Sequence, residues 1–244
     1  MKHGKRYLEA RSAFDREELH SPLQAVRLLK DAPPAKFDET VEVHFNTGLN
    51  VRHADQQLRG TLMLPHGTGR DVRIAVFAEG EKAKEAQDAG ADVVGSADLA
   101  EQIEGGFDDF DVAIATPDQM GTVGKLGRIL GPRGKMPNPK AGTVTFDVGK
   151  AVRESKAGKL EYRTDRGANV HLSLGKKSFD ERQLLENYAA VVDELIRAKP
   201  AAAKGRYLRS VTLTSSMGPG IKIDPTRTKG VVAELEEEPA AATA

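Results

Sequence analysis

The sequence predicts an α/β protein of two domains, one inserted into the other. Strands near both chain ends alternate apolar and polar residues, as in a sheet with one solvent-exposed face. Between them, apolar strands alternate with helices, as in a parallel sheet covered on both faces. We therefore predict a split α+β domain from residues 1–67 and 159–230, and an inserted Rossmann-like three-layer α/β domain from residues 68–158.

Charge follows the same division, although the chain carries no net charge. Residues 1–67 hold 10 basic and 9 acidic residues, and residues 159–230 hold 14 and 8. The predicted insert holds 12 and 15, and residues 231–244 add four Glu. The two flanks thus share the positive charge. The acidic, Ala-rich segment 231–244 is expected to be a disordered tail.

The first flank predicts one helix and two strands. Ser21 and Pro22 form a helix cap and a first-turn proline, and apolar residues follow at helical spacing until Pro33. The predicted strands are residues 40–49, in which Val41, Val43 and Phe45 share one face, and residues 58–64. The basic arm Lys2–Arg6 is expected to be disordered, with phosphate contact the less favoured alternative.

The insert and the second flank are predicted in the same way. The insert is expected to hold strands 72–78, 91–94, 111–115 and 143–146, and helices 81–89, 148–156 and one from Asp98. In the second flank, residues 159–163 and 169–174 are expected to pair as a hairpin, followed by helix 179–198 and strand 207–214. The two chain crossings, at Gly67/Thr68 and Gly158/Lys159, are predicted to form a hinge.

One stretch of the insert, Met120–Gly142, holds six Gly, three Pro and five basic residues but no acid. We interpret it as a short helix leading into a stiff cationic loop suited to a phosphate backbone. A solvated basic loop is the equally favoured alternative. The spacing excludes a Walker-type phosphate loop and a dinucleotide fingerprint. The candidate phosphate contacts are Lys125, Arg128, Arg133, Lys135 and Lys140.

Composition bounds the class of protein further. The absence of Cys, of a signal peptide and of a membrane span predicts a cytoplasmic protein with no membrane partner. The six His are scattered, so we expect no metal site and no cofactor. Aromatic residues make up only 5% of the chain, which favours recognition of RNA by shape over stacking on many aromatics.

Several segments resemble the L1 family of large-subunit ribosomal proteins, the bacterial-type stalk protein near the tRNA exit site. The residues that carry the resemblance are Gly124–Pro139, Ala35–Val43, Asp55–Thr61, Leu64–Gly67 and Ser216–Pro219. The resemblance implies that both chain ends form an RNA-binding domain. It implies contacts to large-subunit rRNA by Lys36, Phe37, Thr40, Ser210, Ser216, Met217 and Gly218.

Each of these contacts has a simpler alternative. Phe37 could stack on a base, but from sequence alone a core position is favoured. Thr40 and Ser216 could bond RNA 2′-hydroxyls or cap turns. Met217 could cover an apolar RNA surface or belong to a plain turn, and Lys36 could be solvated.

The resemblance implies a structural, non-enzymatic protein of the large ribosomal subunit that binds rRNA at the mobile stalk. It further implies two partners beyond rRNA, namely exit-site tRNA, whose release the protein influences, and its own mRNA, whose translation it represses. Two alternatives stay open. One is an α/β enzyme that binds a phosphorylated ligand at the basic loop, and the other is a translational repressor that never enters ribosomes.

Overall fold

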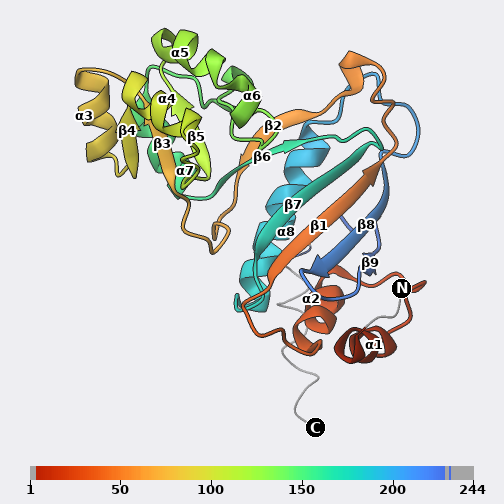
Figure 1. Ribbon diagram of the computed structural model, residues 1–244. Helices are drawn as coiled ribbons and strands as arrows, with labels where there is room; N and C mark the ends of the chain where they lie inside the picture. Colours follow the sequence, from red (N-terminus) through yellow and green to blue (C-terminus); the bar gives the residue numbers. More distant parts are fainter. Residues whose placement is uncertain (1–3, 229–230, 232–244) are drawn as a thin grey trace. The chain divides into compact units, whose positions relative to one another are not determined.

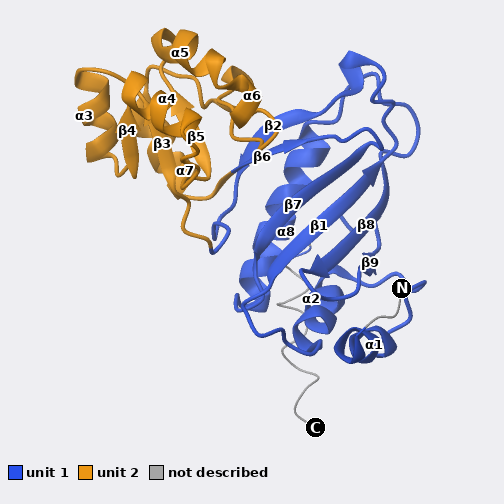
Figure 2. Cartoon of the chain, viewed as in Figure 1, with its two compact units in different colours: residues 1–69, 160–244 blue, residues 70–159 orange. Residues whose placement is uncertain are grey.

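The computed structural model describes residues 4–228 and 231, and its α/β class confirms the predicted fold class. The chain divides into two compact units (Figure 2). Unit 1 holds residues 1–69 and 160–244, and unit 2 holds residues 70–159. Within the described residues, no helix is long and apolar enough to cross a membrane.

The main sheet of unit 1 takes strands from both flanks of the chain. Its four strands run in the order β7-β1-β8-β9 and every neighbouring pair is antiparallel. The strands are β1 (Thr40–Thr47), β7 (Asn169–Lys176), β8 (Leu208–Ser215) and β9 (Ile221–Ile223). Strand β1 therefore lies between two strands that follow it by more than 100 residues (Figure 1).

Two helices cover one face of this sheet. They are α2 (Pro22–Asp31) and α8 (Glu181–Arg197), and each begins with a capping box, at Ser21 and Asp180 respectively. Their apolar faces pack against the inward residues of the strands, among them Phe45, whose ring stacks on Tyr188. Because both helices lie on this side, the opposite face of β7-β1-β8 is left to polar residues.

The predicted hairpin of residues 159–163 and 169–174 is wrong. Strand β6 (Lys159–Arg163) pairs with β2 (Arg59–Met63) in a separate ribbon, whereas β7 pairs with β1. A tight turn does lie between them, where Asp165 accepts hydrogen bonds from the amides of Gly167 and Asn169. The turn forms as its residues suggest, but the strands on either side of it go to different partners.

The basic arm also differs from expectation, since Lys5 and Arg6 lie in a helix, α1 (Lys5–Ser12). Ala10 is buried on this helix, and Arg6 Nη1 donates to the carbonyl of Pro34 at 3.4 Å. The expected disorder is thus wrong from Lys5 onward. Lys2 and His3 lie outside the described residues.

Unit 2 has three layers around a parallel sheet of order β4-β3-β5. Helices α3 and α7 pack on one face, and α4, α5 and α6 pack on the other. The elements are β3 (Ile74–Phe77), α3 (Glu81–Asp88), β4 (Val93–Gly95), α4 (Ala97–Glu104), β5 (Val112–Ala115), α5 (Met120–Lys125), α6 (Gly127–Leu130) and α7 (Val148–Lys156). Of the strand predicted at 143–146, only an isolated bridge between Ala115 and Val144 forms.

The residues predicted as a hinge are held locally at both chain crossings. The carbonyl of Gly67 accepts from the side chain of the buried Asn187 at 3.0 Å, and Lys159 Nζ lies 2.8 Å from Glu154. Thr68 and Gly158 lie one residue away from these contacts, so the division between units falls slightly later, at 69/70 and 159/160. In the predicted tail, Val231 packs in the unit 1 core, and residues 232–244 lie outside the described residues.

Candidate nucleic-acid interface

Two segments from opposite ends of the chain meet at one end of the unit 1 sheet. One is the loop that leads into β1, residues 35–40, and the other is the turn that follows β8, residues 215–219. The amide of Ser216 donates to the carbonyl of Thr40 at 3.1 Å, and Val41 pairs with Ser215 in the sheet. Six of the seven predicted RNA contacts are thus brought together, while Ser210 is not.

A buried carboxylate joins the two segments. Glu39 is only 2% exposed, and its oxygens accept three hydrogen bonds. Its Oε1 accepts from the amide of Ala35 at 3.0 Å, and its Oε2 accepts from the Ser215 hydroxyl at 2.7 Å and the Met217 amide at 3.0 Å. One side chain therefore fixes the backbone on both sides of the candidate surface.

The charge of Glu39 is stabilised in place. Burial alone would raise its pKa, but the hydrogen bonds from Ser215, Met217 and Ala35, with the nearby charge of Lys177, lower the pKa below the ordinary 4.5. The group is therefore ionised at neutral pH. The sequence interpretation did not include Glu39, although the alternation that points Val41, Val43 and Phe45 inward also points Glu39 inward when continued by one step.

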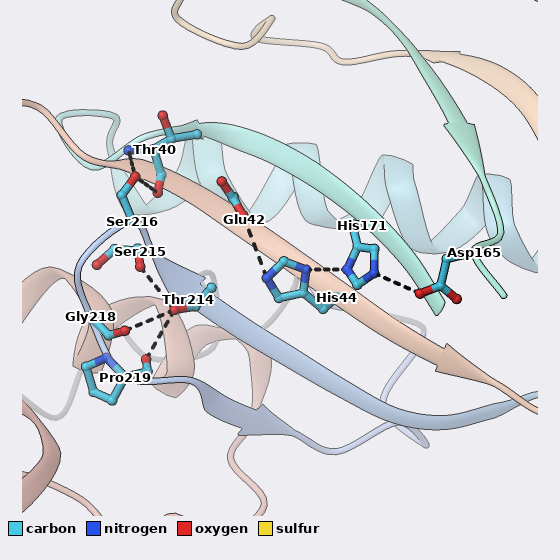
Figure 3. Close-up of polar contacts among 10 residues, drawn as sticks. All are labelled: Thr40, Glu42, His44, Asp165, His171, Thr214, Ser215, Ser216, Gly218 and Pro219. Atoms are coloured by element: carbon cyan, nitrogen blue, oxygen red, sulfur yellow. Dashed lines mark hydrogen bonds and ion pairs between the residues drawn. The ribbon is translucent and has the colours of Figure 1, made fainter. Parts of the chain in front are cut away.

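Gly218 is required by a close approach to Ser215. A Cβ at Gly218 would lie 2.5 Å from the Ser215 hydroxyl oxygen, which is the group that donates to Glu39. The Ser216 hydroxyl is likewise used within the protein, because it accepts from the Thr40 amide at 3.1 Å and lies 3.4 Å from the Thr40 carbonyl oxygen (Figure 3). Both residues hold the turn in place, in line with the turn alternative for Ser216.

The side chains left at the surface are mainly apolar. Met217 is 64% exposed and Phe37 is 56% exposed, and both line the same hollow. The favoured expectation of a core position for Phe37 is wrong, because Phe37 lies in the loop before β1 begins and not on its inward face. Lys36 is also exposed beside it. The Thr40 hydroxyl accepts from Lys176 at 3.1 Å, which leaves its own proton to donate.

Ser210 lies near the other end of the open sheet face, opposite Asn46 on β1. It is exposed, but five residues of β8 separate it from Ser215, about 17 Å in an extended strand. The seven predicted contacts therefore span the length of the sheet face and do not form one compact site.

A polar row crosses the same face between these two ends (Figure 3). Nδ1 of His44 lies 2.9 Å from Nδ1 of His171, and the Nε2 atoms face Glu42 at 3.7 Å and Asp165 at 3.5 Å respectively. Burial and the neighbouring His171 lower the pKa of His44, against the opposing effect of Glu42. Among residues 4–228 and 231, no three His, Asp or Glu side chains are placed to hold a metal ion.

The basic loop of unit 2 separates into bound and free cations. Lys135 Nζ donates to Asp108 Oδ1 at 2.7 Å and to the carbonyl of Phe110 at 2.5 Å, and Arg133 lies 3.0 Å from the same Asp108 carboxylate. These two residues hold the loop together. Lys125, Arg128 and Lys140 are exposed, and their side chains contact no acid within the described part of the chain.

Comparisons with known proteins agree with this geometry. Residues 28–219 match the model of the ribosomal protein L1p/L10e family. The chain is 62% identical over 224 residues to the large ribosomal subunit protein uL1 of Rubrobacter xylanophilus, covering 91% of this chain and 97% of that protein. It is 58% identical over 229 residues to the large ribosomal subunit protein uL1 of Thermobifida fusca, covering 94% and 97%.

Proposed function

Because this chain belongs to the ribosomal protein L1p/L10e family, we propose that it is a structural protein of the large ribosomal subunit that binds large-subunit rRNA at the mobile stalk. The family consists of ribosomal proteins and not of enzymes, which sets aside the enzyme hypothesis for the basic loop. The proposal places the protein in the cytoplasm, with the ribosome.

The observation that carries the proposal is the joining of residues 35–40 and 215–219 by Glu39. It produces a preorganised surface on which Phe37 and Met217 are exposed on a fixed backbone. Large apolar side chains in such positions cost little further ordering when a partner binds. We assign this end of the unit 1 sheet as the principal rRNA contact.

Each side chain then has a distinct role. Phe37 and Met217 cover apolar faces of bases and sugars, and the Thr40 hydroxyl donates to an RNA oxygen such as a 2′-hydroxyl. Lys36 neutralises a phosphate. Ser216 and Gly218 act by shaping the turn, while Ser210 contacts RNA that follows the open face of the sheet.

Gel-shift titrations of a stalk rRNA fragment across a range of salt concentrations test this assignment. Thr40→Ala and Met217→Ala should each weaken specific binding by about 1 to 3 kcal/mol with nearly unchanged salt dependence. Lys36→Ala should lower the slope of log affinity against log salt by about one unit. Met63→Ala is the matched control, because Met63 is also an exposed methionine of unit 1 but lies on β2.

If Thr40→Ala and Met217→Ala bind the fragment like the wild type, while loss of Lys125 and Arg128 abolishes binding, the surface has been placed on the wrong unit. All variants are compared only after their unfolding midpoints are shown to match the wild type.

Two finer roles form part of the proposal. The exposed Lys125, Arg128 and Lys140 of unit 2 support contact with exit-site tRNA and an influence on release of deacylated tRNA. Neutralising all three should slow that release in ribosomes that still contain the protein. A normal release rate would remove unit 2 from this role.

Repression of the protein's own mRNA would use the same surface as rRNA. The stalk fragment should then compete with the mRNA leader, and Thr40→Ala should weaken binding to both. The alternative of a repressor outside the ribosome is tested by sedimentation of cell extract, in which the proposal requires the protein in the large-subunit fraction.

A further inference from the structure

Helix α1 forms one wall of a hollow beside the candidate rRNA surface. The hollow has a volume of about 770 Å³ and is lined by residues 4–7 and 10 of the helix region, by residues 32–37, and by Ser215, Met217 and Gly218. Arg6 donates to the carbonyl of Pro34 across it, which ties α1 to the opposite wall. The hollow is therefore a feature of unit 1 and is continuous with the surface that Glu39 organises.

The lining combines cations with flat apolar side chains. Lys5, Arg6 and Lys36 supply three positive charges, and no carboxylate is among the described residues that line the hollow. Tyr7, Phe37 and Met217 supply apolar surface, with Phe37 and Met217 more than half exposed. The nearby charge of Glu39 lies behind this wall, where its oxygens are occupied by three hydrogen bonds.

We infer that this hollow binds a single unstacked nucleotide of the stalk rRNA, with its base against Tyr7, Phe37 and Met217 and its phosphates beside Lys5 and Arg6. Unpaired RNA bases are held in this way, by stacking on flat side chains with basic residues along the backbone. The inference rests on the proposed function and extends it, because it makes α1 part of the RNA interface.

A nucleotide fits the lining better than a purely apolar occupant. An apolar peptide or lipid chain would leave three cations facing it without counter-charge, whereas a nucleotide brings phosphate together with a planar base. The hollow also lies within the volume range of about 300 to 1,000 Å³ that is usual for sites that enclose small ligands.

The test uses the full chain, a stalk rRNA fragment and an unrelated duplex. Lys5→Ala with Arg6→Ala removes two charges from the hollow, and Arg11→Ala with Arg16→Ala removes two exposed charges from α1 and the loop after it, outside the lining. The first pair should lower the slope of log affinity against log salt by about 1.4 to 1.8, or about 0.7 to 0.9 per phosphate. The control pair should leave the slope close to that of the wild type.

Tyr7→Leu tests the stacking contact separately. It should weaken stalk rRNA binding by about fivefold to a hundredfold without changing the salt slope, because it removes a stacking surface and no charge. Since Arg6 also ties α1 to Pro34, Lys5→Gln alone serves as a second variant that leaves this bond intact and should lower the slope by about half as much.

The outcomes separate this inference from the proposed function. If Thr40→Ala and Met217→Ala weaken stalk rRNA binding but the Lys5/Arg6 pair behaves like the Arg11/Arg16 pair, the nucleotide site is refuted and the rRNA surface stands. If the wild type does not prefer stalk rRNA over the duplex, both fail together. A selective effect of the Lys5/Arg6 pair, with a loss of affinity in Tyr7→Leu, supports the site.

Discussion

Replacing Glu39 should damage both the fold of unit 1 and its RNA surface. Glu39→Ala leaves three donors without their acceptor, namely the amides of Ala35 and Met217 and the hydroxyl of Ser215. A buried donor without a partner costs about 1 to 3 kcal/mol, but the two amides lie near the surface where water can reach them. We therefore expect a loss of about 2 to 4 kcal/mol in the free energy of unfolding.

Glu39→Gln separates the carboxylate from the shape of the side chain. Gln has one acceptor oxygen, so its amino group must face either the Ala35 amide or the Met217 and Ser215 donors. We expect a stability loss of about 1 to 2 kcal/mol. Stalk rRNA affinity should fall about tenfold, which corresponds to one hydrogen bond of about 1.4 kcal/mol that must be restored in the bound state.

The assay is urea unfolding combined with gel shifts, with Glu42→Gln as the control on the same strand. Glu42 is also acidic, but its side chain is 44% exposed on the open face, so its replacement should change stability by less than about 0.5 kcal/mol. Equal stability and equal affinity in Glu39→Gln and the wild type would refute the anchoring role. Lost stability with normal affinity would show that Glu39 supports the fold alone.

Acidification should act through the same group. The pKa of Glu39 is lower in the folded state than its ordinary value of 4.5, so its contribution to stability is present above that value and is lost as pH falls toward the folded pKa. Glu39→Gln should therefore lose less stability than the wild type as the pH is lowered below about 4.5. A parallel acid response in the two proteins would contradict an ionised Glu39.

Three further predictions concern other parts of the chain. His44 has a lowered pKa in the folded state, so wild-type stability should decline as pH falls below about 6.5, and His44→Asn should flatten this part of the profile in urea titrations. Lys135→Met should lower the stability of unit 2 by about 1 to 2 kcal/mol in hydrogen exchange, whereas Lys125→Met should have little effect, because only Lys135 bonds to Asp108 and Phe110. Replacing residues 70–159 by a short flexible linker should leave unit 1 folded and able to bind stalk rRNA in gel shifts, and an unfolded product would show that the units depend on each other.

Local patterns predicted most of the elements. The alternation of β1 and the helical spacing of α8 were sufficient, because both elements bury one regular face against the unit 1 core. The alternation of strands and helices likewise indicated the parallel sheet of unit 2. In each case the side chains that decide the structure are neighbours in sequence.

Pairings between distant segments were not predictable in this way. The turn at Asp165 is local and forms, but the partners of β6 and β7 depend on β2 and β1, which lie about 100 residues earlier. Strand β9 was missed because three residues carry too little alternation. Lys135 was read as a phosphate contact because its partner, Asp108, lies 27 residues away in sequence.

The candidate site shows the same limit more sharply, because its two halves lie 176 residues apart at the bond between Glu39 and Ser215. Residues 35–40 cannot adopt their final backbone until β8 and the turn after it are present, since two of the three bonds to Glu39 come from that turn. Unit 2 is continuous in sequence and needs no such closure, so it can fold first during synthesis. Binding of rRNA at this surface is then possible only after the chain has been made almost to Pro219, which couples recognition to completion of unit 1.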